Sequence, residues 1–169
     1  MSMDENSSPI AVAALFDRLV EESLPGQRGE KAWRAMLHAH ATLMRRLDTD
    51  LREDTGLRLA DFDVLAQLAA AGGELRMTDL AARTLISRSG LTRRVARLVD
   101  EDLLRRANVA GDGRGVVVAL TDAGIARLAE TVPVHLRGVS NLFVERLDDQ
   151  ELAVLETALG RVMVDCTFG

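Results

Sequence analysis

Apolar residues recur at spacings of three and four along much of the chain, the spacing that places them on one face of an α-helix. This pattern predicts a short helix after Pro9 and helices over residues 31–54 and 59–71. A long helix capped by Thr121 and a final helix introduced by Asp148 are expected near the end of the chain. The fold is therefore predicted to be mainly α-helical.

Between these helices, residues 78–121 contain two short helical segments followed by a strand pair. Thr78 is predicted to cap the first segment and Ser87 the second, which should run to about Glu101. A glycine-rich loop and a valine-rich run then predict a β-hairpin. Two helices followed by a small antiparallel β wing describe a winged helix-turn-helix.

The second of these helices has two contrasting sides when it is phased at about 100° per residue. One side is apolar and should pack inward: Leu91, Val95, Leu98 and Val99. The other combines small residues with arginines: Ser89, Arg93, Ala96 and Arg97. Small side chains permit close approach to a major groove, and arginine can donate two hydrogen bonds to a guanine or a phosphate. We therefore predict contacts with double-stranded DNA from the following residues: Thr78, Ser87, Arg88, Ser89, Gly90, Thr92, Arg93 and Arg97.

The predicted hairpin carries three arginines that could also contact DNA. Arg114 at its tip is a candidate for the minor groove, where a narrow A·T-rich stretch attracts arginine. Arg105 and Arg106 are expected to contact phosphates, or one of them anchors the wing through an ion pair. Asp112 either orients a neighbouring arginine or is a turn aspartate.

The net charge of −5 is unexpected for a DNA-binding protein, but the charge is unevenly distributed. Residues 76–114 contain nine arginines and five acidic residues, so this segment is basic and the rest of the chain is strongly acidic. Local potential governs contact with DNA more than the total charge does. Aromatic residues are only 3% of the chain, which argues against stacking of single-stranded bases.

The wing sequence DGRGVVVALTDAG and the preceding SRSGLTRRVARLVDEDLLRR resemble the MarR family of bacterial transcriptional regulators. The resemblance extends from Lys31 to Val164 and departs at Asp102, where the family usually has a glycine. It implies a cytoplasmic homodimer that binds a pseudo-palindromic operator, most often as a repressor. It also implies a small aromatic or anionic effector that relieves repression.

The domain organisation is predicted from the same patterns. Residues 1–29 form an N-terminal arm with a short helix, and residues 57–120 form the DNA-binding domain. Residues 30–56 and 121–166 carry more apolar surface than one small domain can cover, so they should form a helical dimerisation domain. Two recognition helices related by a two-fold axis could then contact successive major grooves.

A ligand pocket is predicted between the winged domain and the dimerisation helices. In the urate-responsive branch of the family, an arginine matching Arg94 and an aspartate matching Asp63 help to bind the ligand, but Ser23 replaces that branch's tryptophan. The pocket would be lined by Trp33, Leu37, His40, Met44, Asp63 and Arg94. The alternative is ordinary core packing with a structural Asp–Arg pair.

Several other functions are not favoured by the sequence. The three histidines and the single Cys166 show no metal-ligand spacing, and no catalytic constellation is recognisable, so neither a metal, a cofactor nor an enzyme is predicted. One cysteine, no signal peptide and no long apolar run indicate a cytoplasmic protein without membrane contact. Two alternatives remain: a dimeric winged-helix module that binds proteins without recognising DNA sequence, and a regulator without a ligand.

Overall fold

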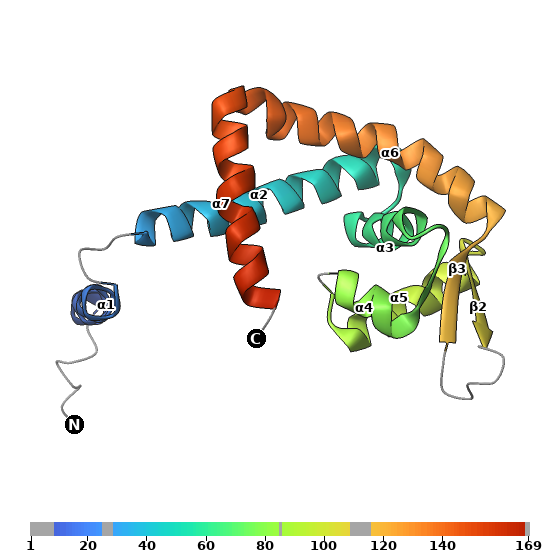
Figure 1. The fold of residues 1–169 in the computed structure, drawn as a ribbon, viewed down its shortest axis with the longest axis horizontal. Coiled ribbons are helices and arrows are strands. Elements are labelled where there is room, and N and C mark those ends of the chain that lie inside the picture. Colours follow the sequence, from blue (N-terminus) through green and yellow to red (C-terminus); the bar gives the residue numbers. More distant parts are fainter. Residues whose placement is uncertain (1–8, 25–28, 85, 109–115, 168–169) are drawn as a thin grey trace. The chain divides into compact units, whose positions relative to one another are not determined.

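The computed structural model describes residues 9–24, 29–84, 86–108 and 116–167. The chain divides into two compact units, Met1–Thr42 and Leu43–Gly169, and the long helix α2 runs from the first into the second. The helices and strands follow one another as α1 (Pro9–Ser23), α2 (Glu30–Thr55), α3 (Leu59–Ala70), β1 (Glu74–Arg76), α4 (Met77–Arg83), α5 (Arg88–Asp100), β2 (Leu104–Asn108), β3 (Val116–Leu120), α6 (Asp122–Leu142), the 3₁₀ turn η3 (Val144–Arg146) and α7 (Asp149–Thr167) (Figure 1).

The first unit contains α1 and the beginning of α2. Pro9 opens α1, as predicted, and the guanidinium of Arg34 on α2 lies 5.7 Å from the centre of the Phe16 ring. This is the distance of a cation–π contact. The apolar stripe of α1 remains exposed in the single chain, and its members are Ile10, Val12, Leu15, Phe16 and Leu19.

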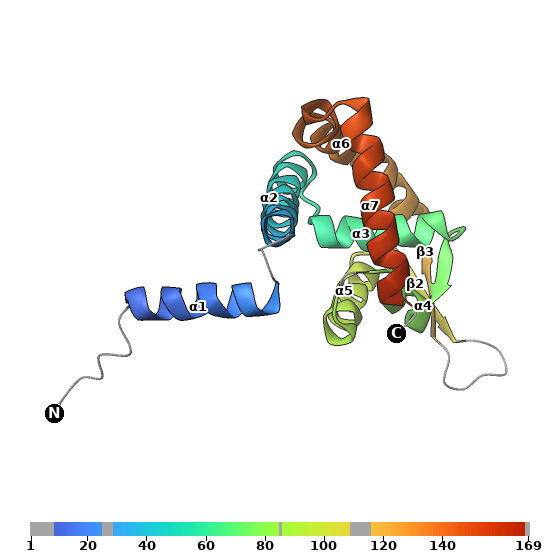
Figure 2. The same cartoon turned by 60° about the vertical axis from the view of Figure 1, so that its left-hand side comes forward.

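The second unit is built around a three-stranded antiparallel sheet and the helices beside it (Figures 1 and 2). The strand order is β1-β3-β2, so β3 is central, with Leu75 opposite Val118 on one side and Arg106 opposite Val118 on the other. β1 pairs with β3 at three positions, residues 74–76. Met77 already belongs to α4 because the chain turns directly from strand into helix.

The core of this unit joins the two predicted DNA-binding helices to the rest of the winged domain. Residues from α3, α4, α5 and the sheet are fully buried in it, among them Leu65, Leu68, Leu80, Leu91, Leu98 and Val118. Leu51 near the end of α2 belongs to the same cluster. The predicted mainly α fold with a small antiparallel wing is therefore confirmed.

Two hydrogen bonds connect the ends of neighbouring helices. Arg58 precedes α3 without a side-chain cap, but the carboxylate of Asp48 on α2 accepts a hydrogen bond from the backbone N–H of Leu59 at 2.8 Å. The guanidinium of Arg127 on α6 donates to the backbone oxygen of Thr55 at the end of α2. Long-range side chains thus satisfy backbone groups that helix ends leave unpaired.

The C-terminal helices begin where the sequence predicted. The hydroxyl of Thr121 accepts a hydrogen bond from the N–H of Gly124 at 3.0 Å and donates to the backbone oxygen of Asp102. Asp102 has the positive φ of 58° that explains why a glycine would suit this position. At α7, Asp148 and Glu151 exchange side-chain to backbone hydrogen bonds at 2.8 and 2.9 Å, a capping box. Within the described ranges, no helix is long and apolar enough to cross a membrane.

Candidate DNA-binding surface

The start of α5 is fixed by a local cap. The hydroxyl of Ser87 accepts a hydrogen bond from the N–H of Gly90 at 3.2 Å, so the predicted cap at this helix is confirmed. A Cβ atom on Gly90 would lie 3.0 Å from both the Ser87 hydroxyl and a methyl group of Ile86. Close packing beneath the cap is therefore one reason for glycine here, independent of any approach to DNA.

The two sides of α5 lie as the periodicity predicted. Leu91, Val95 and Leu98 are completely buried, whereas Ser89 and Arg93 are exposed. Ala96 is half-buried and therefore lies at the border of the exposed side. The apolar side packs into the domain core, so the polar side faces out from it.

Arg88 and Arg93 are the exposed arginines of α5 whose guanidinium groups make no hydrogen bond or ion pair with the described part of the chain. Between them, the Thr92 hydroxyl donates to the backbone oxygen of Arg88 at 3.0 Å and keeps its lone pairs available. The hydroxyls of Ser87 and Ser89 are 3.5 Å apart. This part of α5 offers cations and hydroxyls together, a combination that suits phosphate and base-edge contacts.

Arg97 has a different environment from Arg93, although both were predicted to contact DNA. Its guanidinium pairs with Asp61 on α3 and lies 3.7 Å from Glu101. Arg94 pairs with the other carboxylate oxygen of Asp61 at 2.5 Å. A contact of Arg97 with DNA remains a prediction. It would require DNA to compete with Asp61 for the Arg97 guanidinium, or the guanidinium to leave Asp61.

Asp61 was not identified from the sequence. It nevertheless follows Leu57 by four residues and precedes Leu65 by four, so it lies on the apolar stripe that faces the core. An acid at such a position needs a positive partner, because a buried unpaired charge is costly. The structural Asp–Arg pair considered for Asp63 and Arg94 is formed by Asp61 instead, while the carboxylate of Asp63 accepts a hydrogen bond from Gln67 at 3.3 Å.

The hairpin places Arg105 and Arg106 on β2, and both are exposed. The guanidinium of Arg106 donates to the backbone oxygen of Thr92 on α5 at 3.4 Å. Arg106 thus connects the wing to the recognition helix through a hydrogen bond rather than through the ion pair we considered. Arg114 and Asp112 lie outside the described residues, so their predicted roles are untested.

The prediction that Thr78 caps α4 is wrong. The helix begins at Met77, and Arg76 stands at the cap position without a side-chain hydrogen bond to the helix. The hydroxyl of Thr78 instead lies 3.4 Å from the Asp79 carboxylate. The helix starts early because β1 leads directly into it, which leaves no loop residue to act as a separate cap. Thr78 is exposed, and its DNA contact stays a prediction.

The residues predicted to line a ligand pocket are divided between the two units. The first unit holds Trp33, Leu37 and His40, all exposed on α2 in the single chain, and the second holds Met44, Asp63 and Arg94. The pocket therefore stays a prediction. Among the described residues, no group of three His, Cys, Asp or Glu side chains could hold a metal ion.

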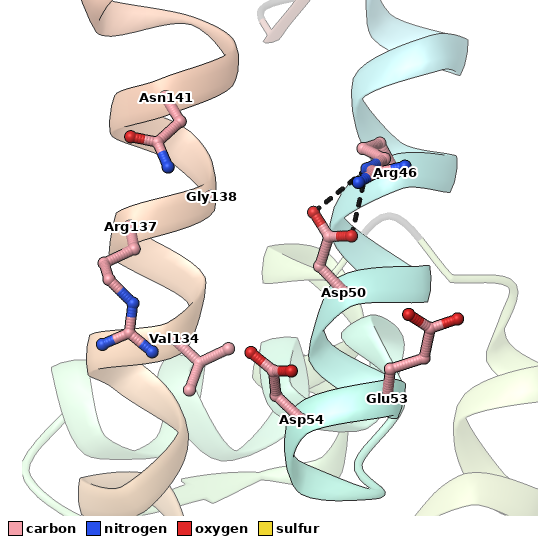
Figure 3. Close-up of a pocket in the computed structure, with 8 residues that line it drawn as sticks. All are labelled: Arg46, Asp50, Glu53, Asp54, Val134, Arg137, Gly138 and Asn141. Carbon is pink, nitrogen blue, oxygen red and sulfur yellow. Dashed lines mark hydrogen bonds and ion pairs between the residues drawn. The ribbon is translucent and has the colours of Figure 1, made fainter.

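A separate polar groove lies between α2 and α6 in the second unit (Figure 3). Its volume is about 190 Å³, and its walls carry Arg46, Asp50, Glu53 and Asp54 on α2, and Arg137 and Asn141 on α6. Arg46 and Asp50 pair with each other at 3.0 Å, as Figure 3 shows. None of the residues predicted to bind an effector lines this groove.

The order of helices, the antiparallel wing and the solvent-facing arginines define a winged helix-turn-helix protein. The model of the MarR family matches residues 55–115. AbsC, a MarR family transcriptional regulator from Streptomyces coelicolor, is similar with 30% identity and a TM-score of 0.76, covering 83% of this chain and 95% of AbsC. The chain belongs to the MarR family, as the sequence predicted.

Two further relatives extend this result. Sco3205, a MarR family regulator from Streptomyces coelicolor solved in complex with DNA, is 32% identical, with a TM-score of 0.72 and coverage of 82% of this chain and 88% of Sco3205. The regulator PecS from Dickeya dadantii (strain 3937) is 32% identical over 108 residues, which are 63% of this chain and 64% of PecS. These relatives are transcriptional regulators, so the prediction that the protein is not an enzyme is confirmed.

Proposed function

We propose that this protein is a transcriptional regulator that binds double-stranded DNA sequence-specifically and inserts α5 into the major groove. The observation that carries the proposal is the exposed polar side of α5, where Ser89, Thr92 and Arg93 face away from a buried apolar side. A relative solved in complex with DNA, Sco3205, supports this assignment. We expect the protein to act in the cytoplasm, where bacterial genomic DNA is found.

The remaining cations have supporting roles in this proposal. Arg88 and Arg105 are exposed and contact phosphates, which fixes the position of α5 on the duplex without selecting a sequence. Arg114 enters the minor groove beside the contacted major groove, and Asp112 orients it. Arg106 holds the wing against α5 through the carbonyl of Thr92.

A second copy of the chain completes the DNA-binding unit. In the single chain, α6 and α7 leave large apolar side chains exposed, including Ile125, Leu136, Val154 and Val162, each more than half exposed. Burial of such surface favours association. A two-fold homodimer places its recognition helices about 34–36 Å apart and selects a pseudo-palindromic operator. Light scattering at micromolar concentration should give twice the 18.4 kDa chain mass, and a monomer would contradict the homodimer.

The regulator represses by occluding its operator, and a small aromatic or anionic molecule relieves repression. The support for this part is the resemblance to the urate-responsive branch of the family, whose ligand-binding arginine and aspartate match Arg94 and Asp63. Such a molecule acts only if it binds one arrangement of the two recognition helices more tightly than the other.

The proposal is tested by selecting genomic DNA fragments with the purified protein, footprinting them, and repeating the binding with candidate metabolites. Sequence-specific binding predicts a protected pseudo-palindrome whose affinity falls steeply with salt, because several phosphate contacts release counterions. A metabolite that is the effector should release the protein from the selected DNA at constant salt concentration. A protein-interaction module would instead enrich no DNA sequence, and that result would overturn the proposal.

A further inference from the structure

One buried carboxylate connects α3 to two arginines of the recognition helix. The side chain of Asp61 is only 4% exposed. One of its oxygens accepts a hydrogen bond from Nη1 of Arg94 at 2.5 Å, and the other pairs with Nη2 of Arg97. Both oxygens are therefore occupied by cations from one helix. The core cluster that α3 and α5 share is apolar, and apolar packing is not directional.

The ion pairs divide the arginines of α5 into two groups. Arg93 and Arg97 are four residues apart and so project from nearly the same side of the helix. The Arg93 guanidinium makes no hydrogen bond or ion pair with the described part of the chain, whereas the Arg97 guanidinium pairs with Asp61 on α3 and its side chain is 46% exposed. The difference comes from Asp61 rather than from the positions of the two residues on the helix.

We propose that Asp61 is a positioning residue for DNA recognition: it holds Arg94 and Arg97, sets the rotation of α5 against α3, and keeps the Arg97 charge away from DNA phosphates. This inference rests on the proposed function. Arg93 then contacts bases from a helix whose orientation is fixed. Arg97 does not serve as a DNA ligand.

The physical benefit of such an arrangement is specificity. A cation that contacts phosphate raises affinity for every DNA sequence by a similar factor, because phosphates carry no sequence information. Releasing Arg97 would therefore strengthen binding to the operator and to random DNA by similar factors, and it would steepen the salt dependence of both. It would also let α5 rotate, which weakens the base contacts of Arg93. The weakened base contacts lower the ratio of operator to random-DNA affinity, whereas the added phosphate contact appears in the salt slope.

The test compares the full-length wild type with Asp61→Asn on a selected operator duplex and on a random-sequence duplex, each over a range of salt concentrations. For Asp61→Asn we expect the affinity ratio to fall at least tenfold. The salt slope on random DNA should steepen by about 0.9 for each arginine that reaches a phosphate. The double variant Asp61→Asn/Arg97→Gln should lose the part of this steepening that Arg97 provides. An unchanged ratio and slope in Asp61→Asn would overturn the inference.

Two single variants keep the test decisive if Asp61→Asn unfolds. Glu101→Gln is a control that removes the same charge as Asp61→Asn from a neighbouring acid. Glu101 is 49% exposed and lies 3.7 Å from Arg97, and such an exposed pair contributes little, so the ratio of operator to random-DNA affinity should stay within about twofold of wild type. Arg97→Gln removes the cation but retains the Asp61–Arg94 pair, so the salt slope should not change. A slope reduced by about 0.9 in Arg97→Gln would make Arg97 a phosphate ligand and refute the inference. Wild-type protein that bound neither duplex would refute the proposed function instead.

Discussion

The imidazole ring of His135 on α6 lies against the phenyl ring of Phe62 on α3, with centroids 4.5 Å apart and planes inclined at 36°. Its Nδ1 atom is buried and has no hydrogen-bond partner among the described residues. Burial lowers the pKa of His135 below the ordinary 6.5, and the nearby Asp63 carboxylate opposes this with a smaller upward effect. The contact between α3 and α6 therefore favours neutral histidine.

This contact makes the stability of the fold depend on pH. Because the pKa of His135 is lower in the folded state, the unfolded chain binds more protons between that pKa and 6.5, and stability in this window rises with pH. The contribution is fully present above pH 6.5 and is lost as the pH falls through the window. Denaturant midpoints measured from pH 7.5 to 5 should fall less in His135→Leu than in wild type. If the denaturant midpoints of the two proteins changed in parallel with pH, His135 would not contribute to the pH dependence of stability.

Three glycines in the C-terminal helices should respond differently to alanine. At Gly124 a Cβ would lie 2.1 Å from the backbone oxygen of Leu103, which cannot move freely, so Gly124→Ala should cost about 2 kcal/mol or more. At Gly138 the nearest atom, 2.7 Å away, is the flexible end of Leu47, so the cost should be smaller.

Gly160 provides the matched control for that series. Apart from the neighbouring backbone of α7, no atom of the described residues would lie within 4 Å of a Cβ at this position, so Gly160→Ala should stabilise α7 by up to about 1 kcal/mol. Thermal melting of the three variants should rank Gly160→Ala highest and Gly124→Ala lowest. Equal melting temperatures for Gly124→Ala and Gly160→Ala would contradict the close approach of α6 to Leu103.

The Ser87 cap allows its structural and DNA-binding roles to be separated. Ser87→Ala removes the acceptor for the Gly90 N–H and should lower stability by about 1 kcal/mol. Ser87→Asp keeps an acceptor at the cap and should retain stability, but it places a negative charge beside DNA phosphates. We therefore expect Ser87→Asp to bind operator DNA more weakly than Ser87→Ala, by filter binding or fluorescence anisotropy. The opposite order would place Ser87 away from the DNA.

Local sequence patterns were sufficient for most of the secondary structure. The caps at Ser87 and Thr121 and the capping box at Asp148 depend on residues within three positions of one another, so they are visible in the sequence. The buried side of α5 follows from helical spacing alone. The cap predicted at Thr78 failed because the position of β1 determines where α4 begins.

Long-range pairing could not be predicted in the same way. Asp61 and Arg94 are 33 residues apart, and the sequence indicated Asp63 as the partner of Arg94 because nothing local shows which aspartate of α3 faces α5. The orientation of Arg97 depends on the same contact, so helical phase assigned it to the DNA-facing set together with Arg93. Similarly, Asp48 supplies the acceptor for the uncapped start of α3 from the preceding helix, eleven residues away.

The central claim, that the exposed side of α5 contacts base edges, is tested most directly by selecting binding sites from random duplex DNA with wild type and Arg93→Ala. We expect wild type to enrich a pseudo-palindrome, and Arg93→Ala to lose the preference for one guanine in each half-site at a cost of about 1–3 kcal/mol. Preferences at the other positions should persist. Identical preferences at every position in the two proteins, or no enrichment by wild type, would contradict the account.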